Sequence, residues 1–171
     1  MRNRRSFDHP DALSIILILM GLTFLSGLFI ALHAYADSDS KRSRKCLVGT
    51  YLIEEGSGTR DIWTFNEDGT FIGTSSAQPL LNFSTLQGVW KQTDWRTVKA
   101  TVLDFSFEDQ GSLRNIARVD FLVRITRHAC EAIEGEFSLR FFESGEDPLH
   151  PETDTGEPYM DLFRGHRITV N

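Results

Sequence analysis

Residues 115–127 read NIARVDFLVRITR, and this stretch decides the fold because apolar and polar side chains alternate along it. One face carries Ala117, Val119, Phe121, Val123 and Ile125, and the other face carries Arg118, Asp120, Arg124 and Thr126. Such alternation is typical of a strand with one buried face. Shifting the pairing by one residue would bury the charged side chains, so the register of this strand is well specified.

Further segments on both sides of this stretch show strand patterns, and turn residues separate them. The predicted strands are 47–54, 60–66, 70–76, 84–93, 96–108, 115–127, 132–143 and 159–170. Glu67-Asp68-Gly69 and Asp109-Gln110-Gly111 are turn signals between neighbouring strands. In the segment 132–143, the face expected to be buried holds Ile133, Phe137, Leu139 and Phe141. No segment after residue 36 has a helical period, so the pattern predicts a sandwich or a closed barrel.

A barrel is preferred because hairpin-linked strands follow one another in up-and-down order and closure removes exposed sheet edges. We therefore predict an all-β domain, an eight-stranded antiparallel up-and-down barrel, preceded by an N-terminal hydrophobic helix. Eight strands enclose either packed side chains or one small ligand. In segment 96–108, the large side chains of Leu103, Phe105 and Phe107 favour their face as the buried one. Asp104 is then expected to face solvent, and Asp120 is expected to pair with an arginine on the surface.

The N-terminal region has the features of an export signal. Basic residues precede an uncharged apolar run at 13–32, which is long enough to span a bilayer as a helix. Ala34-Tyr35-Ala36 matches an A-x-A cleavage site. Residues 1–36 are therefore expected to be either a signal peptide or a retained membrane anchor, and 37–45 a polar linker. Both alternatives place the barrel domain, residues 46–171, outside the cytoplasm, as a periplasmic, secreted or inner-membrane-anchored protein.

The chain has two cysteines, Cys46 at the start of the predicted barrel and Cys130 near a predicted turn. An oxidising compartment would allow them to form a disulfide, and the bridge would close a long loop. Two separate free thiols are the alternative, because the sequence does not supply the Cα–Cα distance that decides between them.

Short motifs connect this pattern to a known group of barrels. They are Gly49-Thr50-Tyr51, the stretch 65–71 (FNEDGTF), Gly88-Val89-Trp90, residues 97–101 (TVKAT) and residues 163–167 (FRGHR). Together they resemble the lipocalin-like, or calycin, barrels, in particular small bacterial members of unassigned function, over residues 47–170. The resemblance implies that Tyr51 takes the place of a tryptophan in a G-x-W motif, and that Arg164 or Arg167 covers its ring. A guanidinium over an aromatic face contributes about 0.5–2 kcal/mol.

Aromatic side chains supply the candidate ligand-binding residues. They are Trp63, Phe65, Phe71, Trp90, Phe105, Phe121, Phe137 and Phe141. Ligand pockets are concave and mostly apolar, so these rings are expected to surround a small apolar or amphipathic ligand. The alternative is a barrel whose interior these rings fill completely, and which acts through its surface.

Motifs for catalysis and for other partners are missing from the sequence. It contains no G-x-S-x-G, P-loop, H-E-x-x-H or C-x-x-C motif, so we assign no catalytic residue and no cofactor. The acidic segment 144–158 has no EF-hand or zinc spacing, and is expected to form a loop or lid without a metal. The net charge of −6 argues against a nucleic-acid partner. A cyclase- or isomerase-type enzyme is a third hypothesis, which an inward Asp104 or Asp120 beside a cavity would support.

Overall fold

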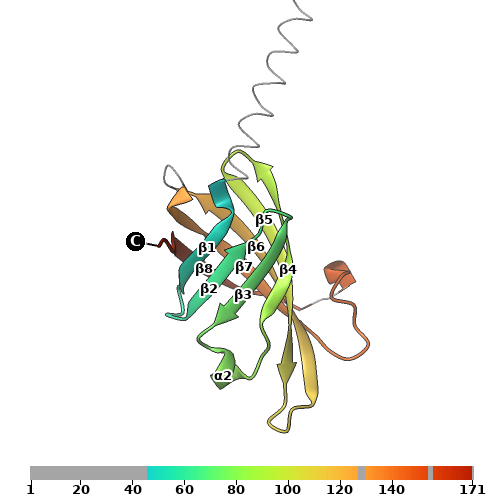
Figure 1. Ribbon diagram of the computed structural model, residues 1–171. Coiled ribbons are helices and arrows are strands. Elements are labelled where there is room, and N and C mark those ends of the chain that lie inside the picture. The colour runs from blue at the N-terminus through green and yellow to red at the C-terminus, as the bar shows by residue number, and fades with distance from the viewer. Residues whose placement is uncertain (1–45, 127–129, 154–155, 171) are drawn as a thin grey trace, which may run out of the picture. The chain divides into compact units, whose positions relative to one another are not determined.

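The structure, a computed structural model, describes residues 46–126, 130–153 and 156–170 (Figure 1). The predicted hydrophobic segment 1–36, whether signal peptide or anchor, and the linker 37–45 lie outside the described residues. Within the described ranges, no helix combines the length and the apolar character needed to cross a membrane.

The described strands form one closed antiparallel barrel in which each strand pairs with its neighbours in the chain. The strands are β1 (Gly49–Glu55), β2 (Arg60–Phe65), β3 (Thr70–Ser75), β4 (Leu86–Asp94), β5 (Thr97–Phe107), β6 (Leu113–Ile125), β7 (Ala132–Phe142) and β8 (Tyr159–Arg167). The barrel closes where β1 pairs with β8, with Tyr51 opposite Arg167. The predicted eight-stranded up-and-down barrel is therefore confirmed.

Short helical elements interrupt the strands at α2 (Gln78–Leu81), between β3 and β4, and at the 3-10 turn η2 (Pro151–Thr153), between β7 and β8. Figure 1 shows α2 beyond the end of β3, at one end of the barrel. Neither element was predicted, because three or four residues are too few to show a helical period.

The inner and outer faces of β6 follow the alternation seen in the sequence. Its buried residues are Ala117, Val119, Phe121, Val123 and Ile125, as predicted. On the outer face Arg118 Nε donates to Asp120 Oδ2 at 2.8 Å, and Thr101 donates to the same carboxylate. The prediction that Asp120 pairs with an arginine on the surface is confirmed.

Strand β5 buries the face opposite to the predicted one. Val98, Ala100 and Val102 are buried, whereas Phe105 is 49% exposed on the outside. Ala100 lies between Trp90 on β4 and Phe121 on β6, so its small side chain leaves space for two large rings. The prediction that Phe105 contributes to the interior is wrong, because ring volume on the neighbouring strands decides which face of β5 fits inside.

One end of the barrel is held by a disulfide between Cys46 and Cys130, and we call it the disulfide end. The two cysteines are 84 residues apart in the chain. Such a cross-link restricts the unfolded chain and contributes about 2–5 kcal/mol to stability. The buried side chain of Leu47 lies beside it in the core.

Arg167 covers Tyr51 at the disulfide end. Its guanidinium carbon lies 5.0 Å from the centre of the Tyr51 ring, and Nη2 donates to the Tyr51 hydroxyl at 2.7 Å. The same guanidinium donates to the carbonyl oxygens of Val48 at 2.9 Å and Cys130 at 3.3 Å, and to that of Cys46. Burial raises the pKa of Tyr51, although the charge of Arg167 acts in the opposite direction. Of the two arginines that the resemblance offered, Arg167 is thus the covering residue.

Gly49 makes this arrangement sterically feasible. Its φ of +146° is a backbone conformation that side chains rarely adopt, and a Cβ there would overlap the guanidinium of Arg167. The glycine of the G-x-aromatic motif is therefore required at this position, because any larger residue would displace the arginine that covers Tyr51.

Candidate ligand-binding site

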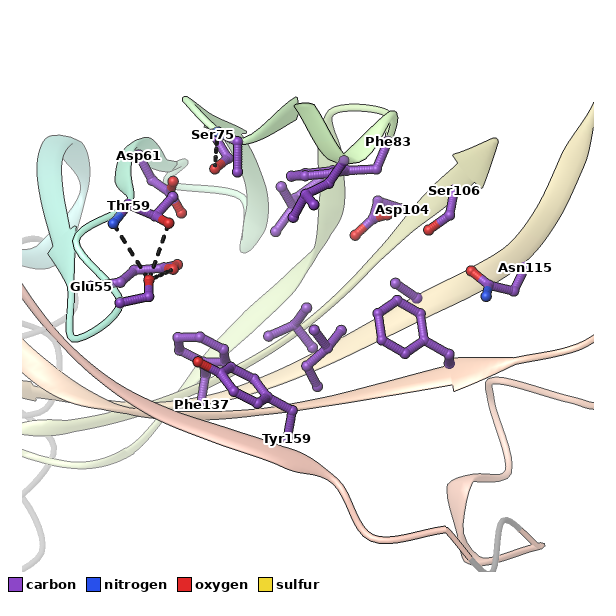
Figure 2. A pocket seen from close by; sticks show the side chains of 18 of the residues that line it. Glu55, Thr59, Asp61, Ser75, Phe83, Asp104, Ser106, Asn115, Phe137 and Tyr159 are labelled. Atoms are coloured by element: carbon purple, nitrogen blue, oxygen red, sulfur yellow. Dashed lines mark hydrogen bonds between the residues drawn. The ribbon is translucent and has the colours of Figure 1, made fainter. Parts of the chain in front are cut away.

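A cavity of about 490 Å³ opens at the end of the barrel opposite the disulfide. This volume lies within the range of roughly 300–1,000 Å³ typical of small-molecule sites. The strand ends on this side supply most of its walls, and the segment around α2 supplies the rest through Ala77, Leu81 and Phe83. We call it the pocket, and Figure 2 shows the side chains that line it.

Aromatic packing explains why the cavity occupies only one half of the barrel. Trp63 packs edge-on against Phe121 and Phe163, with ring centres 4.5 and 4.7 Å apart, and Phe71 stacks on Phe121 at 5.7 Å. Phe65 continues this cluster toward Tyr51 at the disulfide end. The rings fill the disulfide half, and Phe121 forms part of the pocket wall where the filling ends.

The eight predicted ligand-binding rings separate into three groups. Those that line the pocket are Phe121, Phe137 and Phe141. Those that are buried in the core without lining it are Trp63, Phe65, Phe71 and Trp90. Phe105 lies on the outer face, away from the cavity. Phe141 is 51% exposed because it stands at the open mouth.

Two neighbouring carboxyl groups, Glu55 and Asp61, occupy one wall of the pocket. Trp63 Nε1 donates to Asp61 Oδ2 at 3.1 Å, which holds the buried Asp61 side chain in place. Burial, and to a smaller extent the nearby carboxylates of Asp61 and Asp161, raise the pKa of Glu55 to about 8. Glu55 is therefore mostly protonated at neutral pH.

Asp104 projects into the pocket from β5, so the prediction that it faces solvent is wrong. It is only 6% exposed, and its Oδ1 is buried without a hydrogen-bond partner among the described residues. Burial raises the pKa of Asp104 to about 7. Asp104 continues the inward series of Val98, Ala100 and Val102, so alternation along β5 already indicated its direction.

Further polar residues surround Asp104. Ser106 is the next inward residue of β5, and it pairs in register with Asn115 on β6. The Oδ1 atom of Asn115 is also buried without a partner within the described ranges. Figure 2 shows Asp104, Ser106 and Asn115 following one another along the pocket.

Sequence reasoning missed most of these polar residues. Asp61 lies two residues before Trp63, so the spacing placed both on one face of β2. No motif pointed to Glu55, Ser106 or Asn115. Each lies near the end of a strand, where too few alternating residues remain to predict which way a side chain points.

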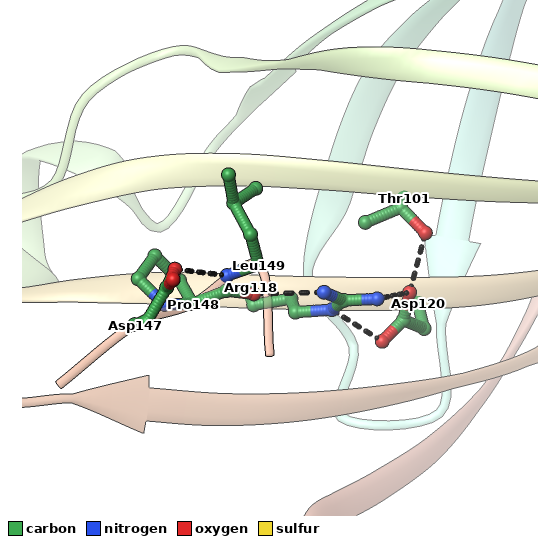
Figure 3. A network of polar contacts seen from close by, with 6 residues as sticks. All are labelled: Thr101, Arg118, Asp120, Asp147, Pro148 and Leu149. Atoms are coloured by element: carbon green, nitrogen blue, oxygen red, sulfur yellow. Dashed lines mark hydrogen bonds and ion pairs between the residues drawn. The ribbon is translucent and has the colours of Figure 1, made fainter. Parts of the chain in front are cut away.

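The described residues between β7 and β8 contact the outer wall of the barrel and do not line the pocket. Arg118 Nη1 donates to the carbonyl oxygen of Pro148 at 2.7 Å (Figure 3), and Arg140 Nη1 donates to that of Gly156 at 2.6 Å. In the parts of the chain that the structure covers, no group of histidine, cysteine and acidic side chains is arranged to hold a metal ion.

The closed antiparallel barrel is compatible with a lipocalin-like fold. Comparison with known protein families found no matching family model, and neither the curated proteins nor the solved structures gave a match.

Proposed function

We propose that this protein is a binding module that holds a small apolar or amphipathic molecule in the pocket. The observation that carries the proposal is the cavity of about 490 Å³, whose wall includes Phe121. Apolar side chains, including Phe137 and Leu139, form much of its surface, and a few polar groups are available to orient a ligand. The disulfide end supplies a rigid base, because it is both cross-linked and fully packed.

The location proposed for this module is outside the cytoplasm, either free or anchored by residues 13–32. The uncharged apolar run in the sequence supports export. The disulfide between Cys46 and Cys130 supports it independently, since such bonds persist mainly in oxidising compartments.

Acid–base catalysis is a second candidate function, which the inward position of Asp104 favours. A carboxyl group with a pKa of about 7 is suited to accept or donate a proton near neutral pH. Recovery of a chemically altered ligand after incubation with the protein, but not with Asp104→Asn, would support this candidate over simple binding.

Binding can be tested with N-phenyl-1-naphthylamine, a neutral dye whose fluorescence increases in apolar surroundings. We expect saturable binding, because the dye matches the apolar lining. Leu139→Trp should weaken it by about 10-fold or more, since one bulky ring would occupy part of the cavity. Fluorescence titration measures both affinities.

Leu162→Trp is the matched control. Leu162 lies on the neighbouring strand β8, is 64% exposed and does not line the pocket, so this variant should bind the dye like the parent protein. Equal loss in both variants, or no saturable binding by the parent protein, would contradict the proposal. The second result would instead favour a barrel that acts through its outer surface, where Leu52 and Ile62 form an exposed apolar pair.

A further inference from the structure

We propose that the ligand carries a cationic amine and that Asp104, Ser106 and Asn115 hold this group. This inference rests on the proposed function, because it names the chemical class of the molecule bound in the same pocket.

The first argument is the missing partner of Asp104. Buried carboxylates in proteins are almost always paired with a cation or with hydrogen-bond donors, since an isolated buried charge is costly. Asp104 has neither among the described residues: its Oδ1 atom is buried without a partner, and its side chain forms part of the lining of the open pocket. A cationic group of the ligand would supply the missing partner.

The second argument is the chemistry of the neighbouring groups. The Oδ1 atom of Asn115 on β6 is a second buried oxygen without a hydrogen-bond donor among the described residues. Ser106 follows Asp104 by two residues on β5 and pairs in register with Asn115, so it lies between these two residues along the pocket. A primary ammonium has three N–H donors and no acceptor, whereas a carboxylate has only acceptors. An ammonium group of the ligand therefore complements the oxygens of Asp104, Ser106 and Asn115. A carboxylate group of the ligand would be repelled by Asp104.

The third argument is the charge of the pocket. Asp61 adds a second acidic group to Asp104, whereas Glu55 is mostly protonated at neutral pH, and Arg114 is the one cationic side chain among the described residues of the lining. Arg114 already pairs with Glu108 at 3.0 Å and donates to the carbonyl oxygen of Phe107 at 3.1 Å. The remaining charge of the pocket favours a positive ligand.

The rest of the lining accommodates the apolar part of such a molecule. Phe137 and Tyr159 lie side by side, with ring centres 6.2 Å apart, and Figure 2 places both across the pocket from Asp104. Leu139 and Val119 extend the same apolar wall. The structure thus indicates an amphipathic amine, with its cationic end at β5 and its apolar end against these side chains.

The test compares three naphthyl compounds by isothermal titration calorimetry at pH 8. They are 2-(1-naphthyl)ethylamine, the neutral 2-(1-naphthyl)ethanol and the anionic 1-naphthylacetate. We expect the amine to bind about 10-fold or more tightly than the alcohol, because it forms charge-assisted hydrogen bonds, and the acid to bind most weakly. Asp104→Asn should reduce the preference for the amine to about threefold or less.

Asp109→Asn serves as the charge control, because it removes one exposed carboxylate from the turn that follows β5. This variant should keep the full preference for the amine. Acidification from pH 8 to pH 6 should weaken binding of the amine more than binding of the alcohol, because Asp104 must be ionised to pair with the amine. The other titratable or charged side chains of the lining are Glu55, Asp61, Arg114 and Tyr159.

Each alternative outcome has a distinct meaning. If the amine and the alcohol bind equally, the inference is overturned while the proposed function stands. If the amine preference survives in Asp104→Asn and is lost in Glu55→Gln, the assignment to Asp104 is wrong. If none of the naphthyl compounds and no N-phenyl-1-naphthylamine binds, the proposed function itself fails.

Discussion

Replacing Arg167 by alanine is expected to lower the free energy of unfolding by roughly 3 kcal/mol. The guanidinium is held between the Tyr51 ring and three backbone carbonyl oxygens, those of Cys46, Val48 and Cys130. Its removal would leave these carbonyls without a charged donor and would open a space beside Gly49. Equilibrium urea denaturation, with the disulfide intact, measures the change.

Arg164→Ala is the matched control for this prediction. Arg164 lies three residues earlier on β8, its side chain is 72% exposed, and it pairs with Glu54 at 3.0 Å. Exposed ion pairs contribute about 0–1 kcal/mol, so this variant should change stability by less than about 1 kcal/mol. Similar losses in the two variants would contradict the role assigned to Arg167. Arg167→Lys should be intermediate, because lysine keeps the charge but lacks the planar fork of donors.

Replacing Asp104 by asparagine is expected to stabilise the protein at pH 8 by roughly 2–4 kcal/mol. In the folded protein burial raises the pKa of Asp104 to about 7, whereas in the unfolded chain it returns to an ordinary value of about 4. The contribution of Asp104 to stability is therefore fully present below about pH 4 and is lost progressively as the pH rises to about 7. Asparagine keeps the shape of the side chain without a charge to bury. The lower value of the expected range allows for water that enters the open pocket.

Denaturation curves at pH 5 and pH 8 test this prediction. The gain from Asp104→Asn should be larger at pH 8, and the parent protein should lose more stability between the two pH values than the variant. Glu55 acts in the same direction up to its pKa of about 8, so the difference between parent and variant is the relevant quantity. A gain that is equal at both pH values, or a loss at pH 8, would show that Asp104 is not a buried acid without a partner.

Local pattern was sufficient to predict the strands and their order. The alternation in 115–127 identified the inner face of β6 correctly, and turn residues such as Asp68-Gly69 marked where hairpins reverse. These features depend on near neighbours in the chain, because side chains alternate along a strand whatever the strand later packs against. The expectations for residues 1–45 concern a part of the chain outside the described residues, and remain predictions.

The candidate site was predicted less completely, because it depends on several strands at once. Phe121, Phe137 and Phe141 line the cavity, whereas Trp63 and Phe65 belong to the packed half, and ligand binding by any of these rings stays a prediction. Whether a ring fills the core or lines a pocket depends on how many rings from other strands lie at the same height along the barrel axis, because those rings occupy the interior volume. Single strands do not contain this information.

By itself, then, the sequence determined an eight-stranded antiparallel barrel and the inner face of β6. Only the tertiary structure decided that Ala100 points inward and Phe105 outward, that Arg167 covers Tyr51, and that Asp104 enters an open pocket. The physical reason is that a closed barrel has a limited interior volume, so the large rings on β4 and β6 require small side chains on β5 between them. Because Ala100 must therefore face inward, Asp104, which lies on the same face of β5, also faces inward.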